Sequence, residues 1–156
     1  MDLFKNITVV GGGSLGHVIS GWLASSGYNV SVLTRKPEHW SKKLTINYSG
    51  KAISSTLSTV TNIPEEAVKN ADIVLLTVPG YANKQELQSI KPYLKEGCFV
   101  GAVFCSSGFF FEALDILPET IRLWGFQRVP FIARVEEYGH AANLLGTKPQ
   151  LNIAAE

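Results

Sequence analysis

Charged residues are scarce in this 156-residue chain. Asp, Glu, Lys and Arg together make up 17% of it, compared with about 25% in typical soluble proteins. The formal net charge is +1, so the composition carries no electrostatic signal for nucleic acid or for an anionic membrane as a partner. Because 46% of the residues are hydrophobic, the low charge predicts that part of the surface contacts something other than water.

Cysteines and long apolar runs are also few or absent. The two cysteines, Cys98 and Cys105, are too close together for a secreted disulfide framework and lack the spacing of metal ligands. No apolar run reaches the roughly 18 residues of a membrane-spanning helix, and the first predicted strand begins too early for a signal peptide. We therefore expect a cytoplasmic protein with two reduced, buried thiols, no metal site and one domain over residues 1–156.

A glycine-rich segment is the most informative feature present. Gly11, Gly13 and Gly16 follow the spacing G-x-G-x-x-G, directly after a predicted strand (residues 6–10) and at the start of a predicted helix (residues 14–26). In this context the motif is typical of a dinucleotide-binding turn, because it combines a tight turn, close approach of a pyrophosphate and close helix packing. The helix N-terminus offers unpaired N–H groups to the phosphates. We predict a phosphate-binding loop of Gly11, Gly12, Gly13, Ser14, Leu15 and Gly16; the alternative is a glycine-rich turn of another α/β protein.

No carboxylate follows the second predicted strand (residues 29–33). An NAD-binding domain usually places Asp or Glu there, about 20 residues after the glycines, to bind the ribose 2′-hydroxyl. Thr34, Arg35 and Lys36 occupy this position instead, and the planar guanidinium of Arg35 is suited to a 2′-phosphate. We therefore predict NADP in preference to NAD; the alternative is that Arg35 covers the adenine ring, which is compatible with either cofactor.

Predicted strands and helices alternate along the chain, which is typical of a parallel sheet covered on both faces. We expect further strands near residues 58–61, 72–78, 98–104 and 121–126, with helices beginning near Pro64, Asn83 and Phe111. A β-hairpin is expected over residues 44–57, and three more strand-like runs follow residue 130. The predicted fold class is α/β: a doubly wound, mostly parallel sheet of the Rossmann type with helices on both faces, plus a small β-hairpin after the second strand.

Two further loops are predicted to line the site, because ligands bind at the carboxyl ends of the strands in such a sheet. One contains Val78, Pro79, Gly80 and Tyr81, and the other spans residues 105–108. Pro79 and Gly80 allow the chain to turn past a flat ring, and we expect Tyr81 to pack on the cofactor. Ordinary turn chemistry is the alternative for both loops.

Histidines are the natural candidates for proton transfer, but we assign none of them a catalytic role. His17 lies in the first turn of the predicted phosphate-binding helix, where its ring can reach a phosphate; a partly exposed helix position is the commoner situation. We expect His39 at the surface, and His140 lies in a turn with no acid partner that the sequence identifies.

Three consecutive aromatic residues, Phe109, Phe110 and Phe111, begin or precede the last predicted helix. They cannot all enter one core from a short helix, so we expect at least one on the surface. Such an apolar face predicts contact with a further domain or with another copy of the chain.

Three segments resemble the opine dehydrogenase family, the octopine and nopaline dehydrogenase group: VVGGGSLGHVISGWLASSGYNVSVLTRKPEHW, ADIVLLTVPGYA and LWGFQRVPFIARVEEYGHAANLLGTK. The third is the most specific, because the first two are also similar to ketopantoate reductase and glycerol-3-phosphate dehydrogenase. The resemblance implies an oxidoreductase in which NAD(P)H reduces the imine formed from an α-keto acid and an amino acid. It also implies a helical substrate domain with a catalytic histidine outside residues 1–156, so that this chain alone would be inactive.

Two other functions are compatible with the same residues. One is a stand-alone NADP(H)-binding module that acts as an accessory subunit or a redox sensor. The other is a dehydrogenase domain of the ketopantoate reductase type.

Overall fold

Seven strands form the main sheet of the computed structural model, which describes residues 4–106 and 108–156. Their order is β11-β8-β7-β6-β1-β2-β5, and every neighbouring pair is parallel except β8 and β11. The strands are β1 (Asn6–Val10), β2 (Asn29–Leu33), β5 (Thr59–Thr61), β6 (Ile73–Leu76), β7 (Phe99–Ala102), β8 (Arg122–Phe126) and β11 (Ile153–Ala155). The chain proceeds from β1 to β2 and β5, then returns to β6 on the other side of β1. The strand order therefore reverses between β1 and β6.

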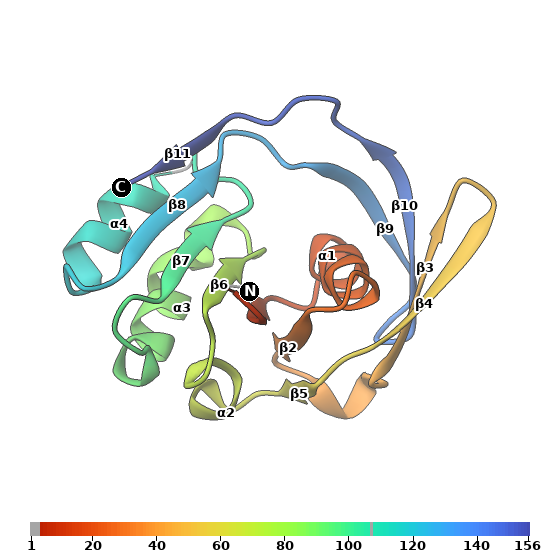
Figure 1. Cartoon of the computed structure of the whole chain (residues 1–156), viewed down its shortest axis with the longest axis horizontal. Coiled ribbons are helices and arrows are strands. Elements are labelled where there is room, and N and C mark those ends of the chain that lie inside the picture. Colours follow the sequence, from red (N-terminus) through yellow and green to blue (C-terminus); the bar gives the residue numbers. More distant parts are fainter. Residues whose placement is uncertain (1–3, 107) are drawn as a thin grey trace.

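Helices cover both faces of this sheet, as the sequence predicts (Figure 1). The helix α1 (Ser14–Ser25) lies on one face, and α2 (Pro64–Val68), α3 (Asn83–Ile90) and α4 (Phe109–Ile116) lie on the other. Short 3₁₀ turns follow β2, β6 and α3: η1 (Pro37–His39), η2 (Gly80–Ala82) and η3 (Lys91–Tyr93). The central strands are apolar on both faces, since Val9 and Val10, or Val74 and Leu75, enter opposite cores. The mostly parallel Rossmann fold is confirmed.

A second sheet of four strands packs over α1. Its order is β4-β3-β10-β9, formed by β3 (Lys43–Tyr48), β4 (Lys51–Thr56), β9 (Phe131–Glu137) and β10 (Ala141–Thr147). The predicted hairpin is β3–β4, and the late strand β10 pairs with β3 in parallel, with Ala141 opposite Thr45. Figure 1 shows α1 enclosed between the two sheets. The sequence predicts strands here but not that they form one sheet with the hairpin.

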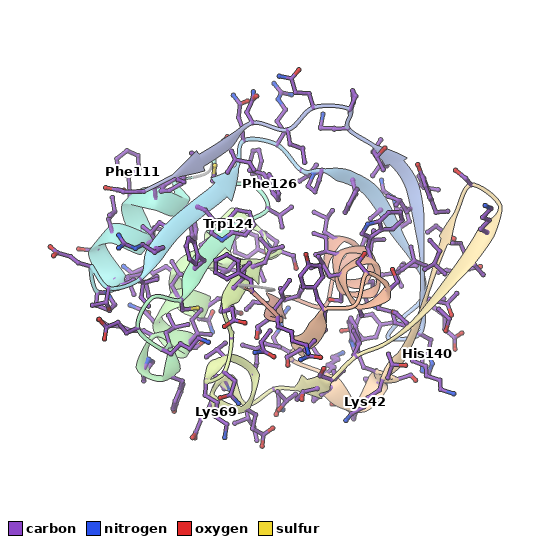
Figure 2. The ribbon with its side chains drawn as sticks, in the orientation of Figure 1. Lys42, Lys69, Phe111, Trp124, Phe126 and His140 are labelled. Atoms are coloured by element: carbon purple, nitrogen blue, oxygen red, sulfur yellow. The ribbon has the colours of Figure 1, made fainter. Side chains whose placement is uncertain are left out.

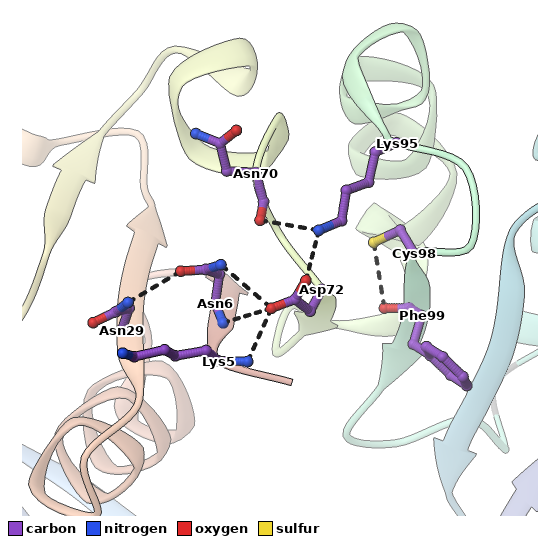
Figure 3. Close-up of polar contacts among 8 residues, drawn as sticks. All are labelled: Lys5, Asn6, Asn29, Asn70, Asp72, Lys95, Cys98 and Phe99. Atoms are coloured by element: carbon purple, nitrogen blue, oxygen red, sulfur yellow. Dashed lines mark hydrogen bonds and ion pairs between the residues drawn. The ribbon is translucent and has the colours of Figure 1, made fainter. Parts of the chain in front are cut away.

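Asp72, just before β6, holds the beginning of β1 in place (Figure 3). Its Oδ2 accepts the backbone N–H groups of Lys5 at 2.9 Å and Asn6 at 2.8 Å, and its Oδ1 lies 2.6 Å from Lys95 Nζ. Burial alone would raise the pKa of Asp72, but the hydrogen bonds from Lys95, Asn6 and Lys5 outweigh it and lower the pKa to about 2. The ionised carboxylate therefore joins β1, β6 and the loop before β7.

Within residues 4–106 and 108–156, no helix is long and apolar enough to cross a membrane. The same residues contain no group of three or more His, Cys, Asp or Glu side chains placed to hold a metal ion.

Candidate cofactor-binding site

The glycine loop, Gly11–Gly16, leaves the carboxyl end of β1 at the point where the strand order reverses. Gly11 has a φ of 119°, a conformation that side chains other than glycine rarely adopt. A Cβ built on Gly11 would lie 2.7 Å from Thr77 Oγ1, and one on Gly16 would overlap the carbonyl oxygen of Gly11. The close packing predicted at Gly16 is therefore present, and it brings α1 against the loop.

Gly13 is different, because it faces open space. A Cβ at this position would meet no atom within 4 Å. Gly13 is also the N-cap of α1, where no side chain of the described residues caps the helix and no acidic residue lies in the first turn. The first N–H groups of α1 are thus free of capping side chains and carry the positive end of the helix dipole, an arrangement suited to an anion.

Ser14 and Leu15 complete the first turn of α1. The Val135 backbone N–H, from β9 in the second sheet, donates to Ser14 Oγ at 3.1 Å. The Ser14 hydroxyl accepts this bond, so its own hydrogen remains available to a ligand. Leu15 is half-buried and packs against the core between the two sheets.

The segment after β2 lies beside the glycine loop. Thr34 is buried, and its Oγ1 occupies the place that a Cβ on Gly12 would need. Arg35 and Lys36 are exposed. Burial raises the pKa of Glu86, on α3, and Arg35 lowers it, so the fold brings a carboxylate within electrostatic reach of Arg35 that the local sequence around Arg35 does not reveal.

The loop after β6 also lies against the glycine loop. The Thr77 hydroxyl donates to the carbonyl oxygen of Val10 at 3.0 Å, and a Cβ on Gly11 would lie 3.0 Å from Val78 Cγ1. Pro79 precedes η2, and Tyr81 within η2 is 90% exposed. The fold therefore places this loop where the sequence predicts it, and contact between Tyr81 and a cofactor stays a prediction.

The loop after β7 is attached to the end of β8. Cys105 is half-buried, rather than buried as we expected, and Ser106 Oγ donates to the carbonyl oxygen of Gln127 at 3.0 Å. Ser107 lies outside the described residues. Cys98 is fully buried, and burial, the largest effect, raises its pKa to about 11. A thiol with that pKa is protonated and chemically inert at neutral pH.

His17 is neither partly exposed nor directed at a phosphate, so both expectations for it are wrong. Its side chain is fully buried, because strands of the second sheet cover this side of α1. Nδ1 lies 2.8 Å from the carbonyl oxygen of Gly13, and the Gly139 N–H donates to Nε2 at 2.7 Å. Burial lowers the pKa of His17, and the hydrogen bond to Gly13 opposes that effect. Both ring nitrogens are thus bound to backbone groups.

The other two histidines lie at the surface. His39 is exposed, and its Nε2 is 3.6 Å from Glu38 Oε1. His140, labelled in Figure 2, is also exposed. Neither has the arrangement of a general base held by a buried acid.

Thr77 and Tyr138 are site residues that the sequence did not reveal. A Cβ on Gly12 would lie 2.9 Å from the Tyr138 hydroxyl oxygen, so this hydroxyl adjoins the loop although Tyr138 lies in the distant β9–β10 turn. No local pattern could have identified it, because only the pairing of β10 with β3 brings the turn here.

A cavity of about 630 Å³ lies elsewhere, between the main sheet and the C-terminal end of α1. Its walls include Ile7, Ile73 and Gly27, together with Trp124 and Phe126 of β8, and no residue of the glycine loop. Figure 2 labels the last two. The cavity is therefore separate from the glycine loop.

The fold and its loops define a nucleotide-binding domain of the Rossmann class. Residues 7–104 match the family described as ketopantoate reductase PanE/ApbA, and the chain belongs to this family. It is also similar to octopine dehydrogenase of Pecten maximus and tauropine dehydrogenase of Arabella iricolor. Each is 32% identical over 93% of this chain and 41% of the relative.

A solved structure of octopine dehydrogenase in complex with NADH and agmatine has the same architecture. It superposes with a TM-score of 0.90 at 30% identity, over 97% of this chain and 42% of that one. The resemblance to the first domain of opine dehydrogenases is confirmed. The chain spans 41% of the length of the two curated relatives named above.

Proposed function

We propose that residues 1–156 form the cofactor-binding domain of an NAD(P)H-dependent oxidoreductase of the opine dehydrogenase type. Such an enzyme reduces the imine formed between an α-keto acid and an amino acid. The observation that carries the proposal is the open, uncapped N-terminus of α1 behind Gly13, at the edge where the strand order reverses. The likeness to octopine dehydrogenase, whose structure was solved with NADH, supports it.

Each loop has a role in this proposal. The N–H groups of the glycine loop, Gly11–Gly16, bind the pyrophosphate, and the segment from Thr34 to Lys36 binds the adenosine end. The loop from Val78 to Tyr81, at the adjacent strand end, borders the rest of the dinucleotide. The bound cofactor supplies a hydride, and this chain holds and orients it.

The substrate site and the group that transfers a proton belong, in our proposal, to a further domain outside residues 1–156. Two observations support a catalytic group outside this chain. His39 and His140 are exposed, and both ring nitrogens of His17 are hydrogen-bonded to backbone groups. We propose that the chain alone binds cofactor without catalysis, and that the whole protein acts in the cytoplasm.

We further propose that NADP binds more tightly than NAD, with its 2′-phosphate on Arg35. Replacing Arg35 by Ala should weaken NADP⁺ binding about tenfold or more, since a charged hydrogen bond contributes roughly 1.5–3 kcal/mol. NAD⁺ binding should change by less than about twofold. Isothermal titration calorimetry of both dinucleotides measures this, with Arg122→Ala, an exposed arginine at the start of β8, as the matched control.

Three results distinguish binding of the 2′-phosphate by Arg35, packing of Arg35 on the adenine, and failure of the proposed function. Equal losses for both cofactors would show that Arg35 covers the adenine instead, and no binding of either dinucleotide by the wild-type chain would refute the proposed function. Glu86→Gln removes a negative charge near Arg35 and should raise NADP⁺ affinity if the 2′-phosphate binds there.

A dehydrogenase of the ketopantoate reductase type is the second candidate, because the family match covers residues 7–104. Assays of the full-length protein with ketopantoate, or with pyruvate and amino acids, distinguish the two.

A stand-alone NADP(H)-binding module is the remaining alternative, and the reading frame of the gene that encodes the chain tests it. A frame continuing for about 200 residues, enough for another domain, supports an enzyme, and a stop codon after Glu156 favours the module.

The surface of α4 is the proposed contact with that further domain or with a second copy. Phe109 is buried and Phe110 half-buried, whereas Phe111 is 83% exposed, as we expected for at least one of the three. Figure 2 shows Phe111 on the outside of α4. Phe104 and Leu114 are also exposed.

A further inference from the structure

Two backbone groups from distant parts of the chain meet on the ring of His17. The carbonyl oxygen of Gly13, in the glycine loop, lies 2.8 Å from Nδ1 and also accepts the His17 backbone N–H at 3.0 Å. The Gly139 N–H, in the β9–β10 turn, donates to Nε2 at 2.7 Å. The ring therefore joins the loop that precedes α1 to the second sheet.

These partners determine the protonation state of the ring. A carbonyl oxygen only accepts, so Nδ1 must carry a hydrogen; a backbone N–H only donates, so Nε2 must be bare. One neutral tautomer alone satisfies both groups. A proton added to Nε2 would point at the Gly139 N–H and abolish that bond.

Aromatic rings and the chain after β2 enclose the histidine. The Trp40 ring lies 4.1 Å from the His17 ring between centroids, and the Tyr138 ring lies 5.3 Å away. The Gly139 carbonyl accepts the Ser41 N–H at 3.0 Å, and a Cβ on Gly139 would overlap the carbonyl oxygen of His39. The β9–β10 turn, with Tyr138 and Gly139, therefore lies between the glycine loop and the segment that follows β2.

Among the described residues, no charged side chain contributes to the pKa shift of the buried ring. The two effects on the pKa of His17 are burial, which lowers it, and the Gly13 hydrogen bond, which raises it. The charged groups on the surrounding elements are all exposed: Arg35, Lys36, Glu38, His39 and Lys42 after β2, Lys43 on β3, Lys51 on β4, Arg134, Glu136 and Glu137 on β9, and His140 beside the turn.

We propose that His17 and the turn of Tyr138 and Gly139 form a latch that holds the glycine loop in its dinucleotide-binding conformation, so that affinity requires the neutral histidine. His17 is then a positioning residue, acting through the Gly13 carbonyl. The proposal rests on the proposed binding of a dinucleotide by this loop. The Tyr138 hydroxyl, beside Gly12 and Thr34, belongs to the same turn, so the latch also holds the side of the loop that faces the adenosine end.

The test is the pH dependence of NAD⁺ affinity, measured by calorimetry from about pH 7.5 to about pH 5, where histidines titrate. NAD⁺ is the probe because it lacks a phosphate monoester, whose second pKa near 6 would confuse the profile of NADP⁺. Because burial lowers the pKa of His17 from 6.5, wild-type affinity should be constant near neutral pH and fall only at the acidic end of this range. Complete protonation would cost about tenfold, as expected for loss of one buried hydrogen bond.

Variants at position 17 separate the latch from mere packing. In His17→Gln the amide oxygen takes the place of Nε2 and cannot be protonated, so affinity should stay constant with pH. His17→Phe keeps an aromatic ring but leaves the Gly139 N–H unpaired, and should lower affinity about tenfold at pH 7.5. His140→Gln, at an exposed neighbouring histidine, should retain the wild-type profile. Circular dichroism confirms that each variant is folded.

Several results would overturn the latch. One is wild-type affinity that rises on acidification, since a protonated ring that attracted the diphosphate would strengthen binding. A His17→Phe variant with wild-type affinity at pH 7.5 is another. A third is a His17→Gln variant that loses affinity as the wild type does. If the wild-type chain binds no NAD⁺ at pH 7.5, the proposed function fails, and the nitrogen NMR shifts of His17 decide the latch separately: hydrogen on Nε2 in the neutral ring would refute it.

Discussion

At the scale of single residues, the three motif glycines differ in what a side chain would cost. Gly16 lies against the backbone of Gly11, whereas Gly13 faces open space with a φ of −82° that any residue adopts. Gly16 allows close packing within the chain, and Gly13 leaves space outside it for a ligand. A single methyl group at each position therefore distinguishes a structural role from a binding role.

Gly16→Ala should destabilise the fold by about 1–3 kcal/mol, because its methyl group overlaps backbone that must shift. For a domain of this size, that corresponds to roughly 2–4 °C in Tm per kcal/mol. Gly13→Ala should leave Tm nearly unchanged and weaken NAD⁺ binding about tenfold, since its methyl group stands where the pyrophosphate is expected. Thermal unfolding and calorimetry measure the two effects. A Gly13→Ala variant with full affinity would contradict the proposed pyrophosphate position.

At the scale of elements, the central strands are held in register at their amino-terminal end by Asp72. Its carboxylate joins the backbone at the start of β1, at Lys5 and Asn6, to Lys95, which precedes β7 (Figure 3). The opposite end of β1 carries the glycine loop. Fixing one end of β1 therefore also fixes where the loop begins.

The pKa of Asp72 is lowered from 3.8 to about 2, which gives the stability of the fold a defined pH dependence. The carboxylate contributes fully above the unfolded value of 3.8 and loses its contribution as the pH falls toward 2. Asp72→Asn should cost about 1–2 kcal/mol at neutral pH, because the Lys95 ion pair is partly solvated. The difference from wild type should vanish near pH 2.

Urea unfolding at several pH values measures the effect of Asp72→Asn, with Asp115→Asn on the exposed side of α4 as the control. A stability difference that is the same at every pH would show that the carboxylate's charge is not involved.

At the scale of the whole molecule, α1 is enclosed on both sides while the surface of α4 is not. The second sheet covers α1, whereas Phe111 on α4 is exposed to solvent (Figures 1 and 2). Apolar side chains gathered on a surface commonly mark an interaction site. The exposed apolar side chains of α4 are thus a place where the low content of charged residues is visible at the surface.

Phe111→Asp should reduce self-association of the chain without altering its stability by more than about 0.5 kcal/mol, because the ring is exposed. Sedimentation velocity over a range of concentrations measures this, and Ile132→Asp, at an exposed position of β9, is the control. A wild-type chain that remains monomeric at every concentration would exclude a second copy and leave a further domain as the proposed partner of α4.

The sequence by itself determined the parts that depend on neighbours along the chain. The β1–α1–β2 unit, the β3–β4 hairpin and the need for glycine at positions 11 and 16 follow from periodicity and turn chemistry within a few residues. The loops at Gly11 and Val78 could be placed at one edge because parallel strands share the direction of their carboxyl ends.

Only the tertiary structure decided what surrounds that loop. The parallel pairing of β10 with β3 brings Gly139 to His17 and Tyr138 to Gly12, and it buries a histidine that the local pattern left at the surface. Glu86 reaches Arg35 by the packing of α3 in the same way. These contacts depend on which strand edges and helix faces meet, and that choice is made by burial of the whole chain rather than by any short segment of it.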